Sequence, residues 1–304
     1  MTRKHIVILA GALLFLSAGA YLGLKFYIEN NAKSRIQQWA IQTGRISGLS
    51  YQSLEMGFFS KTVQFNQVFL QIKDTDIPVS IDKLMLYSFD SKNEIPTFMH
   101  VGIQGIHINR STSFMKGVAP VLAQLGYADI EADVEYAYRY DPVKKDLEIQ
   151  QVRIRVSDMG QLEATARLNN LDLAVVKSIP DNIFLLMAML PGVAISGITL
   201  NYQDDSMTRR LVQFGARRSG QSEDQFVSGM INQLSLEIQK QKLPAARDRL
   251  QAVQNFIKNP GVIEVTISPL QPVPLMRFVL MENTDQLADL LNITLNYHDV
   301  NQKK

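Results

Sequence analysis

Few residues of this sequence have types and spacings that could carry out chemistry. The histidines beyond the N-terminal leader are His100, His107 and His298, and the chain has no cysteine. The missing thiols exclude disulfides, thiolate catalysis and zinc–thiolate sites. A metal pair of His100 with His107 would need a carboxylate nearby, and its spacing matches no metal motif. His107 lies between Ile106 and Ile108, so a solvated histidine on a polar strand face is the simpler interpretation.

The charged pairs of the chain also have structural explanations. Asp204-Asp205 could form an acid pair, but directly before Ser206 these residues more simply cap a helix and favour its dipole. The basic pairs at 209–210 and 217–218 indicate a solvated helix face, or a contact with lipid headgroups or an acidic partner. No phosphate-binding loop, dinucleotide fingerprint, nucleophile elbow or zincin motif is present. We therefore expect no enzyme activity and no cofactor.

Composition is typical of a globular body behind an apolar leader. Hydrophobic residues make up 46% and charged residues 20% of the 304 residues, and the net charge is +2. The charges are mixed along the chain and form no basic stripe, so we expect no nucleic-acid partner.

The leader from Ile6 to Leu24 contains no charge and follows Arg3 and Lys4. At about 1.5 Å per helical residue it spans roughly 28 Å, close to the hydrocarbon thickness of a bilayer. It could be a cleaved signal, because Ala18-Gly19-Ala20 offers a small-x-small site. The apolar run continues past that site, which favours a retained anchor. The predicted anchor residues are Ile6, Leu9, Leu13, Leu16, Leu22 and Leu24.

A ten-residue strand pattern recurs through the middle of the chain, with apolar residues at positions 1, 3, 6 and 8. Copies begin at Val63, Val79, Val101, Leu147 and Val193. The candidate apolar sheet face taken from the first four copies is Val63, Phe65, Val68, Leu70, Val79, Ile81, Leu84, Leu86, Val101, Ile103, Ile106, Ile108, Leu147, Ile149, Val152 and Ile154.

Each copy contains a two-residue slip between positions 3 and 6. Because strand side chains alternate faces, one extra residue would turn the second half of the strand to the wrong side. A bulge or a tight bend at the slip restores the apolar face. The slip pairs are Asn66-Gln67, Asp82-Lys83, Gln104-Gly105, Gln150-Gln151 and Ser196-Gly197.

Plainer strands lie beside these copies. The stretch 134–140 leads into Asp141-Pro142, which predicts a hairpin with the fourth copy, and 162–168 is a short strand after Gly160. Alternation of apolar and polar residues predicts an antiparallel sheet with one wetted face. The apolar face is either covered by helices, for which 113–125 and 183–190 are candidates, or partly open as a groove for acyl chains.

The C-terminal third changes to helical texture. We predict helices over 206–216, after a capping box at Ser222, and from Pro244 to Ile257. A strand follows at 262–267, then a proline-rich extended segment, a short helix at 284–291 and a last strand at 293–297. The last strand indicates that the chain returns to the main sheet, which favours one continuous body.

The stretch 51–72, YQSLEMGFFSKTVQFNQVFLQI, follows a single N-terminal span closely. Its aromatic strand, Gly57-Phe-Phe-Ser60 turn and slipped strand resemble the opening of AsmA-like bacterial envelope proteins. The likeness covers about residues 1–110, and the helical C-terminal third departs from it. The resemblance implies an inner-membrane anchor, a periplasmic β-rich body and a role in envelope biogenesis or lipid movement. It carries over no functional residue.

The sequence therefore predicts an α+β fold, in which an N-terminal transmembrane helix precedes a curved, bulged antiparallel β-sheet with a helical C-terminal third packed on it. We expect a cytoplasmic tail at 1–5, an anchor at 6–28, a juxtamembrane helix at 29–48, a β-rich periplasmic region at 49–202 and a helical region at 203–304.

The expected function is non-enzymatic, in lipid binding or envelope biogenesis at the bacterial inner membrane. The expected partners are the membrane, a phospholipid or another acyl-chain lipid, and envelope proteins. The alternative is a scaffold subunit of a membrane complex that has no ligand groove.

Overall fold

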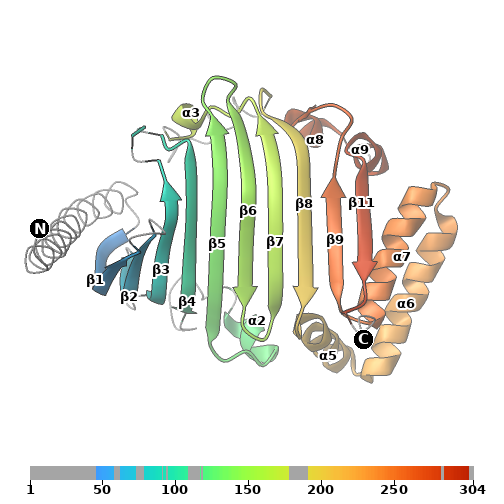
Figure 1. Ribbon diagram of the computed structural model, residues 1–304. Helices are drawn as coiled ribbons and strands as arrows, with labels where there is room; N and C mark the ends of the chain where they lie inside the picture. Colours follow the sequence, from blue (N-terminus) through green and yellow to red (C-terminus); the bar gives the residue numbers. More distant parts are fainter. Residues whose placement is uncertain are drawn as a thin grey trace, which may run out of the picture.

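The computed structural model describes residues 46–57, 62–72, 79–90, 92–93, 95–108, 117, 119–177, 191–281 and 284–300. These residues form one long antiparallel sheet with helices packed at its C-terminal end (Figure 1). The predicted antiparallel sheet with C-terminal helices is therefore confirmed. The anchor from Ile6 to Leu24 lies outside the described residues. Among the residues that are described, no helix has both the length and the apolar character needed to cross a membrane.

Sheet order follows chain order, so most neighbours are joined by hairpins. The strands are β1 (Ile46–Met56), β2 (Val63–Ile72), β3 (Val79–Phe89), β4 (Phe98–Ile108), β5 (Ile130–Asp141), β6 (Asp146–Val156), β7 (Gly160–Asn169), β8 (Ala194–Asp204), β9 (Val262–Ile267), β10 (Val273–Pro274) and β11 (Ile293–His298). The order is β1 to β9 and then β11, while the short β10 pairs with β8. The predicted return of the last strand to the main sheet is confirmed.

The helices lie at the ends of the strands and beyond the last strand (Figure 1). They are α2 (Ala119–Gln124), α3 (Leu173–Lys177), α5 (Met207–Ser219), α6 (Glu223–Lys240), α7 (Pro244–Lys258), α8 (Met276–Leu280) and α9 (Thr284–Leu290). The three long helices α5 to α7 form an insertion between β8 and β9, after which the sheet continues.

The hairpin of β5 and β6 shows how local sequence sets the register. Asp141 Oδ1 accepts hydrogen bonds from the backbone N–H groups of Val143 (2.9 Å) and Lys144 (3.1 Å). Lys145 then has a φ of 58°, and Asp141 lies opposite Asp146. An aspartate that bonds its own turn and a left-handed residue are typical of tight turns. The predicted hairpin is confirmed.

The slips of the third, fourth and fifth copies coincide with register shifts, whereas the slips of the first two copies lie opposite each other without one. In β2 and β3, Phe65 lies opposite Leu84 and Val68 opposite Ile81, so both strands slip at the same level. Gln67 has a φ of 51°. In β4, the three-residue step from Ile103 to Ile106 lies opposite a two-residue step in β5, which is a bulge at Gly105.

The helical region begins and ends as its sequence predicts. Ser222 caps α6 by accepting a hydrogen bond from the backbone of Gln225, whose side chain bonds the Ser222 N–H in return. This is the predicted capping box. Pro244 lies in the first turn of α7, where its missing N–H leaves no helical bond unmade. Arg249 of α7 donates a hydrogen bond to the carbonyl of Ile293 at 3.2 Å, which ties the helix to β11.

Two predicted helices differ from the structure. The juxtamembrane helix at 29–48 overlaps β1, whose first residue is Ile46; the rest of that range lies outside the described residues. The strand starts early because Ile46 and Leu49 pair with apolar residues of β2. The helix at 113–125 is described only as α2, which runs from Ala119 to Gln124. The candidate cover at 183–190 lies outside the described residues.

Candidate functional site

One face of the sheet is apolar across its whole width, because the strand register aligns apolar residues in rows. Two adjacent rows cross the centre of the face. The first row is Leu54, Phe65, Leu84, Ile103, Val134, Ile154, Leu162, Tyr202, Ile263 and Tyr297. The second row is Val63, Leu86, Val101, Tyr136, Val152, Ala164, Leu200, Val265 and Leu295.

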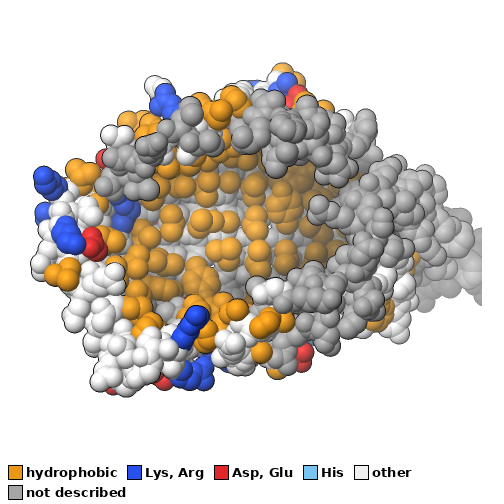
Figure 2. Space-filling view, turned by 180° about the vertical axis from the view of Figure 1, so that it is seen from behind, with side chains coloured by type: hydrophobic (Ala, Val, Ile, Leu, Met, Phe, Trp, Pro, Cys, Tyr) orange, Lys and Arg blue, Asp and Glu red, His pale blue; other side chains and the backbone are white. Residues whose placement is uncertain are grey.

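The apolar side chains form a broad floor on this face of the molecule (Figure 2). From β4 to β11 the side chains of both central rows are only partly buried, whereas a covered sheet face buries them fully. At the β1 end the same face is closed: Phe65 is 2% and Val68 1% exposed within a buried cluster. The floor is therefore accessible over its central and C-terminal strands. We call these half-buried rows, from β4 to β11, the apolar floor.

Bulges keep the floor continuous. In β6, the step from Ile149 to Val152 lies opposite the two-residue step from Ala166 to Ala164 in β7. The extra residue of β6 restores the inward direction of Val152, because without it every later side chain would point to the other face. In β8, a register shift opposite Arg167 and Leu168 likewise keeps the later apolar side chains of the strand on the floor side.

Helix α7 limits the floor at the β11 edge. Tyr202 of the first row contacts Phe256 of α7, with ring centroids 6.1 Å apart. Ala246 and Ala252 of α7 are buried. Small buried residues let a helix approach a sheet closely, so α7 forms a wall beside the last strands and leaves the centre of the floor uncovered.

Tyr136 and Tyr138 add hydroxyl groups to the floor from β5. Burial raises the pKa of both phenols, so both stay neutral at physiological pH. Their rings lie 5.7 Å apart, and the Tyr138 hydroxyl donates a hydrogen bond to the carbonyl of Pro96 at 3.0 Å. Neutral phenols beside aliphatic side chains suit an apolar ligand better than a charged one.

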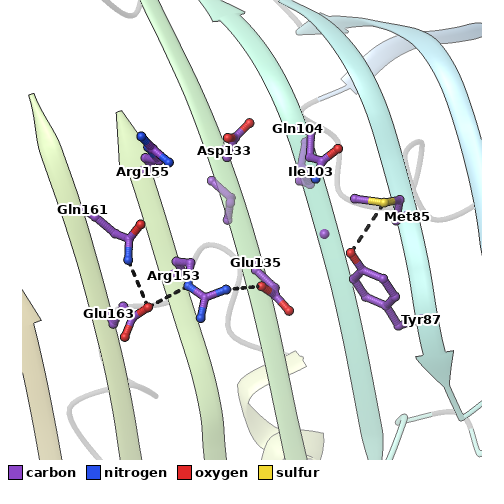
Figure 3. A pocket seen from close by; sticks show the side chains of 12 residues that line it. Met85, Tyr87, Ile103, Gln104, Asp133, Glu135, Arg153, Arg155, Gln161 and Glu163 are labelled. Atoms are coloured by element: carbon purple, nitrogen blue, oxygen red, sulfur yellow. Dashed lines mark hydrogen bonds and ion pairs between the residues drawn. The ribbon is translucent and has the colours of Figure 1, made fainter. Parts of the chain in front are cut away.

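The opposite face of the sheet carries a ladder of charged side chains across β5 to β7 (Figure 3). Glu135 lies 2.7 Å from His100 Nε2 and accepts a hydrogen bond from Arg153 at 2.8 Å. Arg153 donates a second hydrogen bond to Glu163 at 2.7 Å. A shallow hollow of about 330 Å³ lies over this ladder, lined also by Met85 and Tyr87.

The ladder uses its charges internally. The Glu135 carboxylate accepts hydrogen bonds from three side chains, those of His100, Gln151 and Arg153. The Arg153 guanidinium donates to two carboxylates, and its hydrogen bond with Glu163 raises the pKa of Arg153. The arrangement fits cross-strand stabilisation of a solvated face.

The histidines take separate partners. His100 pairs with Glu135, while His107 lies 3.3 Å from Asp82 and is about half exposed, as a polar strand face predicts. Within the described ranges, no three potential metal-ligating side chains of histidine, cysteine, aspartate or glutamate come together. Asp204 caps α5, because its Oδ1 accepts hydrogen bonds from the Thr208 backbone and hydroxyl, both at 2.9 Å. The predicted capping role is confirmed for Asp204.

The register brings all the predicted face residues onto the apolar side. Beyond the two central rows, Val68 lies opposite Ile81 and Ile81 opposite Ile106, while Leu70 lies opposite Val79. Ile108 lies opposite Ile130 at one end of the strands, and Leu147 and Ile149 pair with Tyr140 and Tyr138 at the other. Whether these residues bind a ligand stays a prediction. The predicted anchor residues lie outside the described part of the chain.

Sequence reasoning missed the part of the floor that lies in β5 and from β7 to β11. Tyr136, Leu200 and Val265 belong to the second central row, yet none was a candidate face residue. The signal was present as plain alternation in 134–140, 162–168 and 262–267. The three stretches have no slip, so the repeated pattern passed over them, whereas Leu200 ends the fifth copy, from which no candidate face residue was taken.

The fold and its floor define a class of protein with one meandering antiparallel sheet and one accessible apolar face. Among protein families, a model described as "Uncharacterized protein" matches residues 153–298, from the second half of β6 to the end of β11. This segment includes the C-terminal helices and the strands of the floor from β7 to β11. No curated protein matches the chain.

Proposed function

We propose that this protein binds the acyl chains of lipids on its apolar floor and carries out no catalysis. One observation supports the proposal: the two central rows are apolar in every strand from β4 to β9 and in β11, and they stay partly exposed there. Soluble proteins seldom leave so large a contiguous apolar patch open unless it contacts lipid, ligand or another protein.

The dimensions of the face suit lipid. From β4 to β11 in sheet order the open part of the face has six strand spacings of about 4.8 Å, roughly 29 Å in all. One leaflet of a bilayer is about 15 Å of hydrocarbon, half of a core of about 30 Å. The face is thus longer than a single acyl chain normal to the membrane. Curvature from the bulges gives the face the walls that a hydrocarbon ligand needs.

The location proposed is the bacterial inner membrane, with the body on the periplasmic side. The uncharged stretch from Ile6 to Leu24 supports an anchor, and the chain's lack of cysteine is compatible with an oxidising compartment. The resemblance of residues 1–110 to AsmA-like envelope proteins supports the same location and a role in envelope biogenesis.

The test is lipid analysis of the full-length protein. The chain is purified in mild detergent, washed, and examined by native mass spectrometry and by mass spectrometry of extracted lipids. We expect phospholipid to co-purify in a defined molar ratio to the protein. A fluorescent fatty acid should also bind to the protein, and added phospholipid should displace it. Protein that carries no lipid and binds no acyl-chain probe refutes the proposal. The intact mass from the same experiment shows whether the leader is retained.

A protein-docking role is the second candidate, and one observation favours it. Three leucines of the helical insertion are exposed: Leu211 (47%), Leu236 (57%) and Leu243 (44%). Exposed leucines on neighbouring helices could contact a subunit of a membrane complex. A crosslinking pull-down that recovers one stoichiometric protein, together with a lipid-free preparation, would favour this scaffold role over lipid binding.

A further inference from the structure

A second hollow lies at one end of the strands, apart from the central rows of the floor and from the charged ladder. It is formed by the loop between β9 and β10 together with α8 and α9, and has a volume of about 520 Å³. Ligand sites in proteins begin near 300 Å³, so this hollow can hold a small polar group. Its rim carries Leu270, and its lining includes Arg277 and Asp289.

The hollow contains two charged side chains that have no partner in the part of the chain that the structure describes. Arg277 and Asp289 are both exposed, and no hydrogen bond or ion pair within the described residues engages the guanidinium or the carboxylate. The base of the hollow is fixed, because Asn292 Nδ2 donates hydrogen bonds to the carbonyl (3.2 Å) and hydroxyl (3.1 Å) of Ser268. A cation and an anion that are unpaired among the described residues of a single hollow match a ligand that carries both charges.

Leu270 stands at the rim with 99% of its surface exposed. Pro269 and Pro272 flank it and restrict the loop, so the leucine is held outward at a low entropic cost. The turn of β5 and β6 lies at the same end of the sheet (Figure 1) and presents Val143, which is 90% exposed, beside Lys144. Projecting apolar residues beside lysines are typical of contacts with a membrane interface.

We propose that this hollow binds the zwitterionic headgroup of a membrane phospholipid, with the phosphate at Arg277 and the ammonium group at Asp289. Leu270 then enters the acyl region of the same lipid surface. A guanidinium suits phosphate through paired N–H donors, and the carboxylate selects a headgroup with an amine over one with a purely negative charge. This inference extends the proposed lipid-binding function to a second site that reads the headgroup.

Headgroup selectivity is tested with soluble probes that have no acyl chains. Glycerophosphoethanolamine and glycerophosphoglycerol are titrated into the full-length protein in detergent and followed by ligand-observed NMR. We expect glycerophosphoethanolamine to bind more tightly. Arg277→Gln should weaken both ligands about tenfold, because the phosphate loses its charged donor. Asp289→Asn should weaken only glycerophosphoethanolamine, and so remove the preference. A wild type that binds neither probe, or an Asp289→Asn variant that keeps the preference, overturns the proposal.

Insertion of the loop is tested by fluorescence, which the cysteine-free sequence makes straightforward. Leu270→Cys is labelled with bimane in full-length protein reconstituted into nanodiscs, and Leu236→Cys serves as the control at an exposed leucine of α6. We expect a lipid-borne quencher to quench the label at position 270 and not at position 236. Equal quenching at both positions, or none at 270, overturns the proposed contact.

The outcomes separate this inference from the proposed function. If acyl chains bind the floor while neither headgroup probe binds, the function stands and the second site is refuted. If the headgroup binds while no acyl chain is retained, the second site stands and the floor hypothesis is refuted.

Discussion

Replacing Gly105 with alanine is the most direct test of how the sheet keeps its apolar side chains on one face. Gly105 forms the bulge of β4 with a φ of 64°, a left-handed conformation. A Cβ at this position would approach Asp82 of the neighbouring strand, lying 2.6 Å from its Cγ and 2.8 Å from its Cβ. Gly105→Ala therefore strains the backbone and displaces Asp82 at once.

The expected loss of stability has two parts. A non-glycine residue in the left-handed region costs about 1–2 kcal/mol. Displacing Asp82 breaks its contacts with Gln67 (3.2 Å) and His107 (3.3 Å), which are exposed and contribute about 0.2–1 kcal/mol. We expect a total of roughly 1.2–3 kcal/mol, which for a chain of this size lowers the Tm by on the order of 5 °C.

The assay is chemical denaturation of the full-length protein in detergent, followed by circular dichroism. Gly229→Ala is the matched control: it lies within α6, where an added Cβ meets nothing within 4 Å, so this change should stabilise by about 0.5–1 kcal/mol. The double variant of Asp82→Ala with Gly105→Ala should be more stable than the sum of the two single effects predicts, because the clash with the Asp82 carboxyl group is gone and only the contact with the Cβ at position 82 remains. A Gly105→Ala variant as stable as wild type, or strictly additive effects, would refute the reasoning.

Two further predictions follow from the floor and from the β3–β4 connection. Leu200→Gln places an amide in the second central row and should weaken binding of a fluorescent fatty acid about 10-fold, since an unpaired polar group against hydrocarbon costs about 1–3 kcal/mol. Thr199→Gln, one residue along on the opposite face, should leave that affinity unchanged, and equal effects of both changes would exclude the floor as the binding surface. Asp90 is only 5% exposed. Its carboxylate pKa lies well below the usual 3.8, because it accepts hydrogen bonds from the Asn93 side chain, from the Thr97 backbone and hydroxyl, and from the Lys92 backbone. Its stabilising contribution is present above about pH 4 and is lost as the pH falls below that value, so the urea midpoint should fall between about pH 5 and pH 3 in wild type and less steeply in Asp90→Asn.

Much of the sheet could be predicted because its signals are local. The slip pattern predicted the irregular positions of β2 and β4, and both Gln67 and Gly105 have left-handed φ angles there. Asp141 marked the β5–β6 turn, and Ser222 with Gln225 marked the start of α6. In each case the residues that form the structure are within a few positions of one another.

The features that escaped prediction depend on distant residues. The β1 strand takes its register from apolar partners in β2, and nothing in 46–48 alone excludes a helix. The wall formed by α7 depends on contacts such as Phe256 with Tyr202, which are far apart in the sequence. The hollow beside Leu270 joins a loop to two short helices whose charges, at 277 and 289, carry no local motif.

The hairpin order of the strands makes the length of the apolar face a modular property. Because each strand from β1 to β9 pairs with its chain neighbours, one hairpin could be duplicated or lost without rearranging the others. Each such event would change the face by about 10 Å, two strand spacings. The insertion of α5 to α7 between β8 and β9 already shows that the sheet tolerates interruption and then resumes its order. Evolution could therefore adjust the reach of this surface one hairpin at a time, much as a repeat protein grows by units.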